Sequence, residues 1–430
     1  MIIVNMKNME SIDMNNETIN HPNVFIVDKP MGSGKTCSAI NYINNSNRNE
    51  RFLIITPYIS EVERYQRECP SKKFVEPYKK RGKKINGIKD LIRQGKNIVS
   101  THALFQRFDK EIIDLCSVLN YTLIMDEVAD VVRDTQYSED DINNLLNVYC
   151  DYNEETGLLI WRDSKKDYHG KFDDAKNMSE LGGLALARGK MLMWLFPIEV
   201  FKAFQKTFIL TYMFNAQIQR YYYDYYNIQY KFIHVDGDSI ENYHFTEKET
   251  LDFHYDYENL IHILNNEKLN KIGDEKFNLS VSWYEKNSHS AVMKQLKDNI
   301  YNFFNNIRKS KTTDNLWTCY KDYKNELLGK GYTKGYLFIG ARAMNEYRFR
   351  SNVVYPVNIF LNPMIKGFFQ DHGVEVDEDG YALSEMLQWI WRSAIRDGNP
   401  IWVYIPSSRM RNLLSDWIES VSITNNETSE

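Results

Sequence analysis

Short apolar runs alternate with helical stretches through the first half of the chain. Each run is apolar through its middle, which is typical of strands covered on both faces of a sheet. Strands that alternate with helices form parallel α/β sheets. The pattern predicts a sheet of about six strands, with the apolar runs at Val24–Asp28, Phe52–Thr56, Ile98–Thr101, Thr122–Asp126, Phe208–Thr211 and Tyr230–Val235.

The second half of the chain predicts another α/β unit. Apolar residues recur at helical spacing over Ser290–Ile307, with Val292, Leu296, Ile300 and Phe304 on one face. Further helical patterns cover Tyr323–Leu328, Leu383–Ile395 and Arg409–Ile418. Strands are expected at Leu316–Tyr320, Tyr336–Ile339, Val357–Phe360 and Ile401–Ile405.

Domain boundaries follow from where this alternation stops. A charged, turn-rich stretch predicts an insertion at about 150–190 within a first domain of 23–235. The second domain then covers 236–420. The polar, Asn-rich residues 1–22 are expected to form a flexible leader, and residues 421–430 a flexible tail.

Composition narrows the classes of function. The formal net charge is −5, so the protein as a whole has no positive field that would attract nucleic acid. Any nucleic-acid-binding surface must therefore be a local basic stripe. The five cysteines include no C-x-x-C pair, which argues against a zinc site or disulfide framework and is typical of a reducing compartment. No apolar run reaches membrane-spanning length. We expect a cytoplasmic protein without a membrane partner, in the host cytoplasm if a phage encodes it.

The first strand leads directly into Lys29-Pro30-Met31-Gly32-Ser33-Gly34-Lys35-Thr36. A glycine-rich loop between a strand and a helix lets backbone N–H groups surround a triphosphate, while the lysine reaches the β and γ oxygens and the threonine hydroxyl binds Mg²⁺. The usual first glycine is replaced by Lys29. An accidental turn is the alternative, but a Gly-Lys-Thr sequence behind a strand argues against it. We expect ATP to be held by Pro30, Met31, Gly32, Ser33, Gly34, Lys35 and Thr36.

Asp126 and Glu127 end another apolar strand. An aspartate at a strand end can hold Mg²⁺ through water, and the adjacent glutamate can polarise the attacking water. The alternative is a helix-capping aspartate followed by a glutamate in the first turn. The position of the pair downstream of the phosphate loop favours the catalytic interpretation.

Gln388, Arg392 and Arg396 recur every four residues in a helical pattern. This spacing predicts one shared polar helix face. Arginines far in sequence from a phosphate loop can stabilise the charge on a transferring γ-phosphate across a cleft. The alternative is the solvated face of an amphipathic helix. An arginine in this role is called an arginine finger, and which of the two would act as the finger stays open.

Hydroxyl residues end two more predicted strands, at Thr56-Pro57 and Ser100-Thr101. In parallel sheets such loops line the ligand crevice, and hydroxyls with backbone N–H groups can hold nucleic-acid phosphates. Ordinary helix caps are the alternative for both.

Taken in order, these motifs resemble those of a superfamily 2 DEAD/DEAH-box-like helicase. The sequences Pro-Met-Gly-Ser-Gly-Lys-Thr and Gln-Trp-Ile-Trp-Arg-Ser-Ala-Ile-Arg are similar to those of phage, mobile-element and viral origin-binding-protein helicases. The resemblance implies two RecA-like P-loop NTPase domains in tandem, with ATP and Mg²⁺ in the cleft between them. It also implies a coupling role for Thr211, and nucleic-acid contacts by Arg342 and Asn345, although the usual Gly-x-Asp ending is absent there.

The resulting hypothesis is an ATP-dependent DNA helicase or translocase in phage or mobile-element replication, recombination or repair. DNA is the favoured partner, as a single strand or fork, with a replication protein as a further partner and a monomer as the favoured state. An RNA helicase is one alternative. Another is an ATP-dependent switch or loader that acts on a protein partner.

Overall fold

The larger of two parallel sheets contains all the strands expected in the first half of the chain. The computed structural model describes residues 23–57, 59–250, 256–340 and 345–427. The sheet order is β12-β11-β1-β10-β4-β2-β3, and every neighbouring pair is parallel except β11 and β12. Its strands are β1 (Val24–Asp28), β2 (Arg51–Thr56), β3 (Ile98–Thr101), β4 (Tyr121–Asp126), β10 (Lys206–Thr211), β11 (Tyr230–Asp236) and β12 (His244–Thr246).

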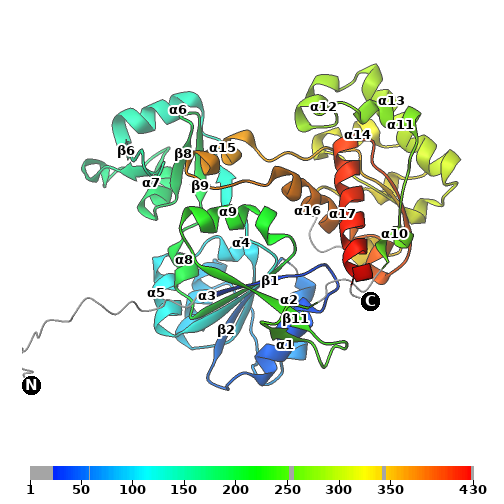
Figure 1. Cartoon of the computed structure of the whole chain (residues 1–430). Helices are drawn as coiled ribbons and strands as arrows, with labels where there is room; N and C mark the ends of the chain where they lie inside the picture. The colour runs from blue at the N-terminus through cyan, green and yellow to red at the C-terminus, as the bar shows by residue number, and fades with distance from the viewer. Residues whose placement is uncertain (1–22, 58, 251–255, 341–344, 428–430) are drawn as a thin grey trace, which may run out of the picture.

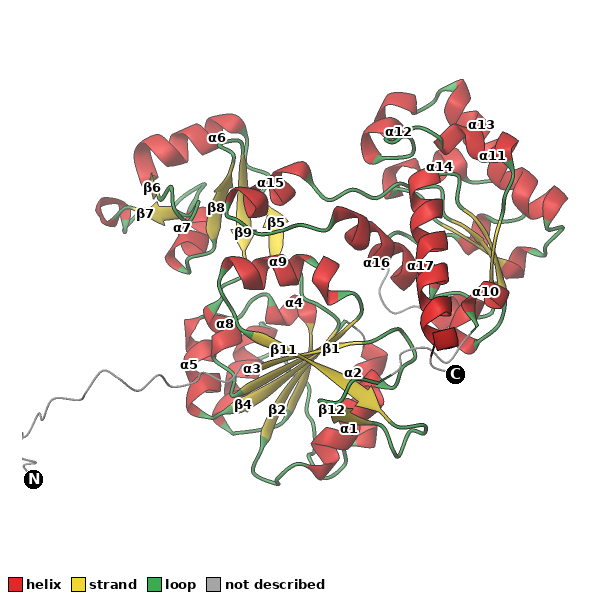
Figure 2. Cartoon of the chain, viewed as in Figure 1, coloured by secondary structure: helices red, strands yellow, loops and turns green. Residues whose placement is uncertain are grey.

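Helices cover both faces of this sheet (Figures 1 and 2). Because successive strand residues point to opposite faces, Ile55 packs in one core and its neighbour Ile54 in the other. Both are fully buried, which explains why the strands read as continuous apolar runs. The helices are α1 (Lys35–Asn45), α2 (Ile59–Glu68), α3 (Lys84–Arg93), α4 (His102–Phe105), α5 (Lys110–Val118), α8 (Glu199–Lys202) and α9 (Ile218–Tyr225).

A smaller unit is inserted between β4 and β10. It begins at Val132 and ends at Leu195, so it is longer than the stretch of about 150–190 in which the sequence pattern is lost. An aromatic cluster of Tyr149, Trp161 and Tyr168 packs inside it. Its elements are β5 (Val132–Asp134), α6 (Glu139–Asn144), β6 (Cys150–Tyr152), β7 (Leu159–Trp161), α7 (Asp173–Glu180), β8 (Leu184–Ala187) and β9 (Met191–Leu195).

The second domain holds a four-stranded, fully parallel sheet in the order β13-β16-β15-β14. Its strands are β13 (Ile261–Ile263), β14 (Asn315–Trp317), β15 (Asn352–Val354) and β16 (Ile401–Tyr404). The main helices are α12 (Val281–Asn287), α13 (Ala291–Asn302), α16 (Glu378–Ile390) and α17 (Ser408–Glu427). The predicted fold class, two RecA-like α/β domains in tandem with an insertion in the first, is confirmed.

Two of the expected strands in this domain are wrong. Tyr336 makes only an isolated bridge to Trp317, and 357–360 is irregular. Val357 is fully buried without strand pairing, directly after Pro356, which lacks a backbone N–H to donate. The apolar character of these runs therefore reports burial in the core. The strands form instead at β13 and β15.

Helix α15 (Pro363–Asp371) lies apart from the rest of the second domain. It follows β15 in the chain but packs on α9 and the insertion (Figure 1). Phe369 is fully buried and lies 6.0 Å from the Tyr221 ring, while Phe368 lies 5.2 Å from the Tyr225 ring. The second domain is therefore anchored on the first by an apolar helix. None of the described helices is long and apolar enough to cross a bilayer.

We expect Phe369→Ala to lower the free energy of unfolding by about 3–5 kcal/mol, because it leaves a cavity in this contact. Asp371→Asn should leave stability nearly unchanged, because the ion pair between Asp371 and Arg188 is about half exposed on both sides. Urea titration followed by tryptophan fluorescence measures both variants. Equal losses would show that α15 is not anchored by its apolar face.

Candidate active site

The phosphate loop has the backbone geometry of an anion cradle. Gly32 and Gly34 have φ of 86° and 81°, values that favour glycine. Gly34 is the N-cap of α1 and has no side chain that could cap the helix. The first backbone N–H groups of α1, at the positive end of the helix dipole, can therefore bind an anion. The buried Ser33 hydroxyl has no hydrogen-bond partner among the described residues. These donors fit a group of phosphate oxygens.

Lys35 is the first residue of α1, and its ammonium group lies inside the loop. It donates to the carbonyl oxygens of Lys29 and Pro30 at 2.5 and 2.7 Å. Both acceptors are neutral carbonyl oxygens. Hydrogen bonds to charged phosphate oxygens are stronger, so the Lys35 ammonium can leave these carbonyls for a bound phosphate. The Lys35 charge also acts on Asp126, whose pKa it lowers.

Asp126 and Glu127 lie at the carboxyl end of β4, beside the loop. Burial, together with the charges of Glu127 and Glu61, raises the pKa of Asp126 to about 7, while Lys35 and Arg64 act in the opposite direction. Glu127 has a φ of 75°, and its backbone N–H donates to the Leu210 carbonyl at 2.9 Å. A buried carboxylate of this kind gains from a nearby cation, so Asp126 and the Thr36 hydroxyl fit a divalent metal.

The arginines of the second domain do not lie on the continuous helix that the spacing predicts, and this expectation is wrong. Helix α16 ends at Ile390, and Ala394–Asp397 forms a separate 3-10 turn. The Ser393 hydroxyl donates to the Ile390 carbonyl at 2.6 Å and so competes for a helical acceptor. Arg392 therefore lies in the connecting turn and Arg396 in the 3-10 turn.

All these groups nevertheless line one pocket of about 380 Å³. The first domain contributes the loop from Met31 to Thr36 together with Asp126 and Glu127, and the second contributes Gln388, Arg392 and Arg396. Pro30, predicted with the loop, is buried and supplies a carbonyl oxygen to Lys35. The donor set of backbone amides, one lysine and two arginines fits a nucleoside triphosphate with its metal.

Several residues of the pocket wall were missed by sequence reasoning, among them two charged residues of α2. Glu61 and Arg64 lie on α2, and Arg64 forms ion pairs with Glu61 at 3.4 Å and Glu68 at 3.0 Å. Arg64 also donates to the Cys37 sulfur at 3.2 Å. Their spacing on an ordinary amphipathic helix carries no signal, because only the sheet order brings α2 to the pocket.

The predicted nucleic-acid residues are partly accessible. Thr56 and Thr101 are register partners at the ends of β2 and β3. The Thr56 and Ser100 side chains are buried, whereas Pro57 and Thr101 are partly exposed. Of these residues, Pro57 and Thr101 would therefore be the ones that contact nucleic acid directly at this edge of the sheet. Arg342 lies outside the described residues, and Asn345 begins a short 3-10 turn.

Thr211 lies at the end of β10, in register with Asp28 of β1. Its carbonyl accepts from the Lys29 N–H at 3.1 Å, which joins it to the phosphate loop. The next residue, Tyr212, reaches the second domain, where its hydroxyl accepts from the Trp417 indole N–H at 2.9 Å. The segment that follows Thr211 therefore contacts both the phosphate loop and the second domain.

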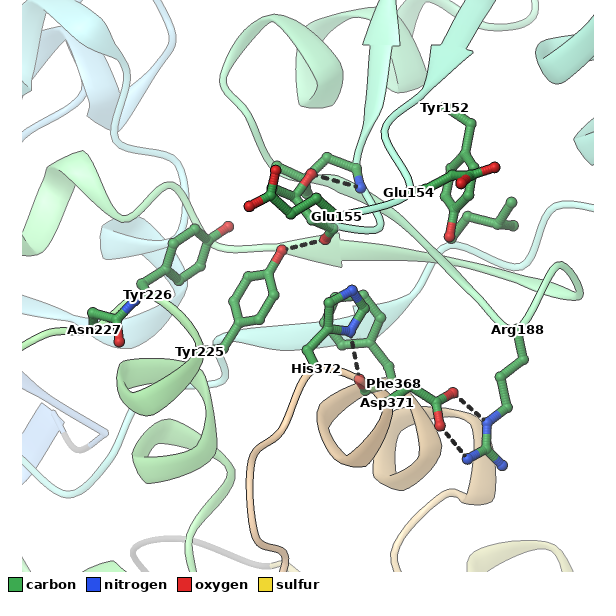
Figure 3. A pocket seen from close by; sticks show the side chains of 13 residues that line it. Tyr152, Glu154, Glu155, Arg188, Tyr225, Tyr226, Asn227, Phe368, Asp371 and His372 are labelled. Carbon is green, nitrogen blue, oxygen red and sulfur yellow. Dashed lines mark hydrogen bonds and ion pairs between the residues drawn. The ribbon is translucent and has the colours of Figure 1, made fainter.

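A second pocket, of about 480 Å³, lies where the insertion, α9 and α15 meet (Figure 3). On its wall Arg188 donates to both Asp371 oxygens, at 2.7 and 2.8 Å. Glu154 and Glu155 add exposed carboxylates. Because its one arginine is already paired and the remaining charge is negative, this pocket does not fit a second polyphosphate.

The raised pKa of Asp126 predicts a pH-dependent stability. In the unfolded chain this carboxyl ionises near 3.8, but near 7 in the folded chain. Between these values only the folded state keeps the proton, so the stability that Asp126 contributes falls as pH rises from about 4 to about 7 and is then constant.

We therefore expect Asp126→Asn to stabilise the metal-free protein, with a gain that grows up to about pH 7 and is on the order of a few kcal/mol above it. Thermal unfolding at pH 5.5 and pH 8.5 measures the difference. The exposed Asp167→Asn variant is the control. A gain of equal size at both pH values would contradict the assignment.

Two XPD structures are similar to most of this chain at low sequence identity. An apo XPD structure is 13% identical and covers 91% of this chain and 95% of its own, with a TM-score of 0.46. S. tokodaii Xpd4 is 10% identical and covers 92% and 94%, with a TM-score of 0.45.

The sequence itself matches one family over nearly its full length. Residues 132–194 match the YonV middle domain, which coincides with the insertion, and residues 255–418 match the YonV C-terminal Rossmann-like domain. The chain is 41% identical over 416 residues to the SPbeta prophage-derived protein YonV of Bacillus subtilis (strain 168), covering 92% of this chain and 99% of that protein. The chain therefore belongs to the YonV family.

Proposed function

We propose that this protein is an ATP-dependent motor of the superfamily 2 helicase type that acts on nucleic acid. One observation carries the proposal: a single pocket contains a phosphate loop and an Asp-Glu pair from the first domain, and two arginines from the second. Hydrolysis that needs groups from two domains makes domain contact part of the catalytic cycle. This is the property that a motor requires.

Each group has a distinct task in this proposal. The backbone N–H groups from Gly32 to Lys35 bind phosphate oxygens, and the Lys35 ammonium neutralises charge on the β and γ groups. Thr36 and Asp126 would hold Mg²⁺, which supplies charge stabilisation for the transferred group. Glu127 orients and polarises the attacking water. Arg392 or Arg396 stabilises the charge that develops on the γ-phosphate, while Gln388 lies beside them in the pocket.

Nucleic acid is the favoured partner, and DNA is favoured over RNA. Pro57 and Thr101 lie at strand ends on the same sheet edge as the phosphate loop, so bound nucleic acid there is close to the hydrolytic groups. The contact between Tyr212 and Trp417 supports a coupling role for the segment after Thr211. The prophage-derived relative supports a phage or mobile-element origin, and the role that we propose there is in DNA replication, recombination or repair.

A switch or loader that acts on a protein partner uses the same nucleotide pocket, and an RNA helicase uses the same fold. Stimulation of ATP hydrolysis distinguishes these three functions. A motor on DNA is stimulated by single-stranded DNA and an RNA helicase by RNA, whereas a protein-directed switch responds to neither.

We expect ATP hydrolysis by the full chain to need Mg²⁺ and to rise when single-stranded DNA is added at low salt. Glu127→Gln should bind ATP but not turn it over, because only the water-polarising group is lost. Lys35→Ala should abolish hydrolysis and weaken ATP binding, because a positive charge on the β and γ phosphates is lost. Steady-state ATPase assays with single-stranded DNA, duplex DNA and RNA measure this. Hydrolysis by Glu127→Gln at the parental rate would overturn the catalytic assignment, and unstimulated hydrolysis without nucleic-acid binding would favour the switch.

Removal of the finger arginine should reduce kcat by on the order of 10³-fold, with a smaller change in KM, because the charge it stabilises develops in the transition state. Arg392→Ala and Arg396→Ala identify which of the two acts. Arg133→Ala, an exposed arginine of the insertion, is the matched control. Full activity in both pocket variants would exclude hydrolysis across the two domains.

A further inference from the structure

The order of the first sheet determines the direction in which a bound nucleotide must lie. The phosphate loop follows β1, while Asp126 and Glu127 lie at the carboxyl end of β4, two strands away across β10. The γ-phosphate end of a nucleotide faces this carboxylate side, since water and metal act there. A nucleoside triphosphate is a linear chain, so its base must extend to the other side of β1, toward β11 and β12.

The connection between β11 and β12 covers the loop on that side. If Gly34 carried a Cβ, that atom would lie 2.5–2.7 Å from three ring carbons of Tyr243. No side chain other than that of glycine leaves room for the ring at this distance. Tyr243 is therefore packed directly against the residue at which α1 begins.

Hydrogen bonds from α1 hold this connection in place. The Asn41 side-chain amide of α1 donates to the carbonyl oxygens of Ile240 and Tyr243, both at 2.9 Å. Beyond β12, the Lys29 ammonium of the phosphate loop donates to the Thr250 carbonyl at 2.8 Å. The backbone at Tyr243 is thus held directly against α1, the helix that begins at the phosphate loop.

Tyr243 and Ile240 form the accessible apolar part of the pocket wall on this side of the loop. Most of the wall consists of glycines and charged or polar groups, and its other aromatic residue, Trp391, is buried, whereas Ile240 is 64% exposed and Tyr243 is half-buried. An exposed isoleucine beside a tyrosine ring offers a flat apolar surface. A nucleobase is a flat group that stacks on aromatic rings whatever its hydrogen-bonding edge.

We propose that Tyr243, with Ile240, forms the subsite for the nucleobase of the bound nucleotide. The Tyr243 ring stacks on the base, and its packing on Gly34 sets the distance between the base subsite and the phosphate loop. Since stacking is stronger for the larger ring, the subsite favours purine over pyrimidine nucleotides. The inference rests on the proposed nucleotide function and identifies the part of the pocket that recognises the base.

The test compares a ligand that has a base with one that has none. Isothermal titration measures the affinity of the full chain for ATP, CTP and inorganic tripolyphosphate, each with Mg²⁺. We expect Tyr243→Ala to weaken ATP binding about tenfold and to leave tripolyphosphate binding unchanged. Tyr243→Phe should keep the parental affinity, because the ring is retained. Tyr152→Ala, a tyrosine of the second pocket, is the matched control and should change neither ligand.

Each other result overturns a defined part of the proposal. Unchanged ATP affinity in Tyr243→Ala would exclude a base contact. Equal weakening of ATP and tripolyphosphate would show that the ring only supports the phosphate loop. If the parental protein bound neither ligand, while circular dichroism showed it folded, the proposed nucleotide function would fail together with this inference.

Discussion

The apolar contact between α15 and the first domain is the interaction on which the candidate active site depends. α15 leads through a short connection to α16, which carries Gln388 near its end. The turns that hold Arg392 and Arg396 follow directly. The Tyr221 hydroxyl accepts from the Asp377 N–H at 3.0 Å and donates to its carbonyl, also at 3.0 Å. Asp377 in turn caps α16, because its carboxylate accepts from Gly380 at 2.8 Å. The arginines are thus positioned through a chain of contacts that begins with buried phenylalanines.

The first domain alone leaves an excess of negative charge around Asp126 in the pocket. Asp126 is buried beside Glu127 and Glu61, and this crowding of negative charge makes ionisation of Asp126 unfavourable. Lys35 and Arg64 oppose the effect only in part. In the proposed function, a metal held by the carboxylates would add positive charge on one side of the phosphates, and the two arginines would add it on the other. The charges of the pocket would then balance only when metal, phosphates and both domains are together.

The sequence predicted those parts of the site that are encoded locally. Two glycines and a lysine after an apolar strand specify a phosphate loop without any distant contact, and Asp126-Glu127 ends a strand that its own residues predict. Residues whose role depends on tertiary neighbours could not be found in this way. Arg64 reaches the pocket only because of the sheet order, and Tyr243 only because Gly34 leaves space for its ring. The pairing of Arg392 and Arg396 was predicted, but not the helix break between them, because Ser393 is compatible with either conformation until its hydroxyl finds Ile390.

Because α15 belongs to the second domain but packs on the first, the two domains cannot be separated or exchanged as independent modules. The chain crosses between them not only at the linker after β12 but again before and after α15. A second domain expressed alone would display Ile365, Phe368 and Phe369 to water, an apolar face of the kind that drives aggregation. Recombination that exchanged only this domain between relatives would also separate α15 from its partner tyrosines on α9. The two domains are therefore expected to be inherited and to diverge together, as one evolutionary unit.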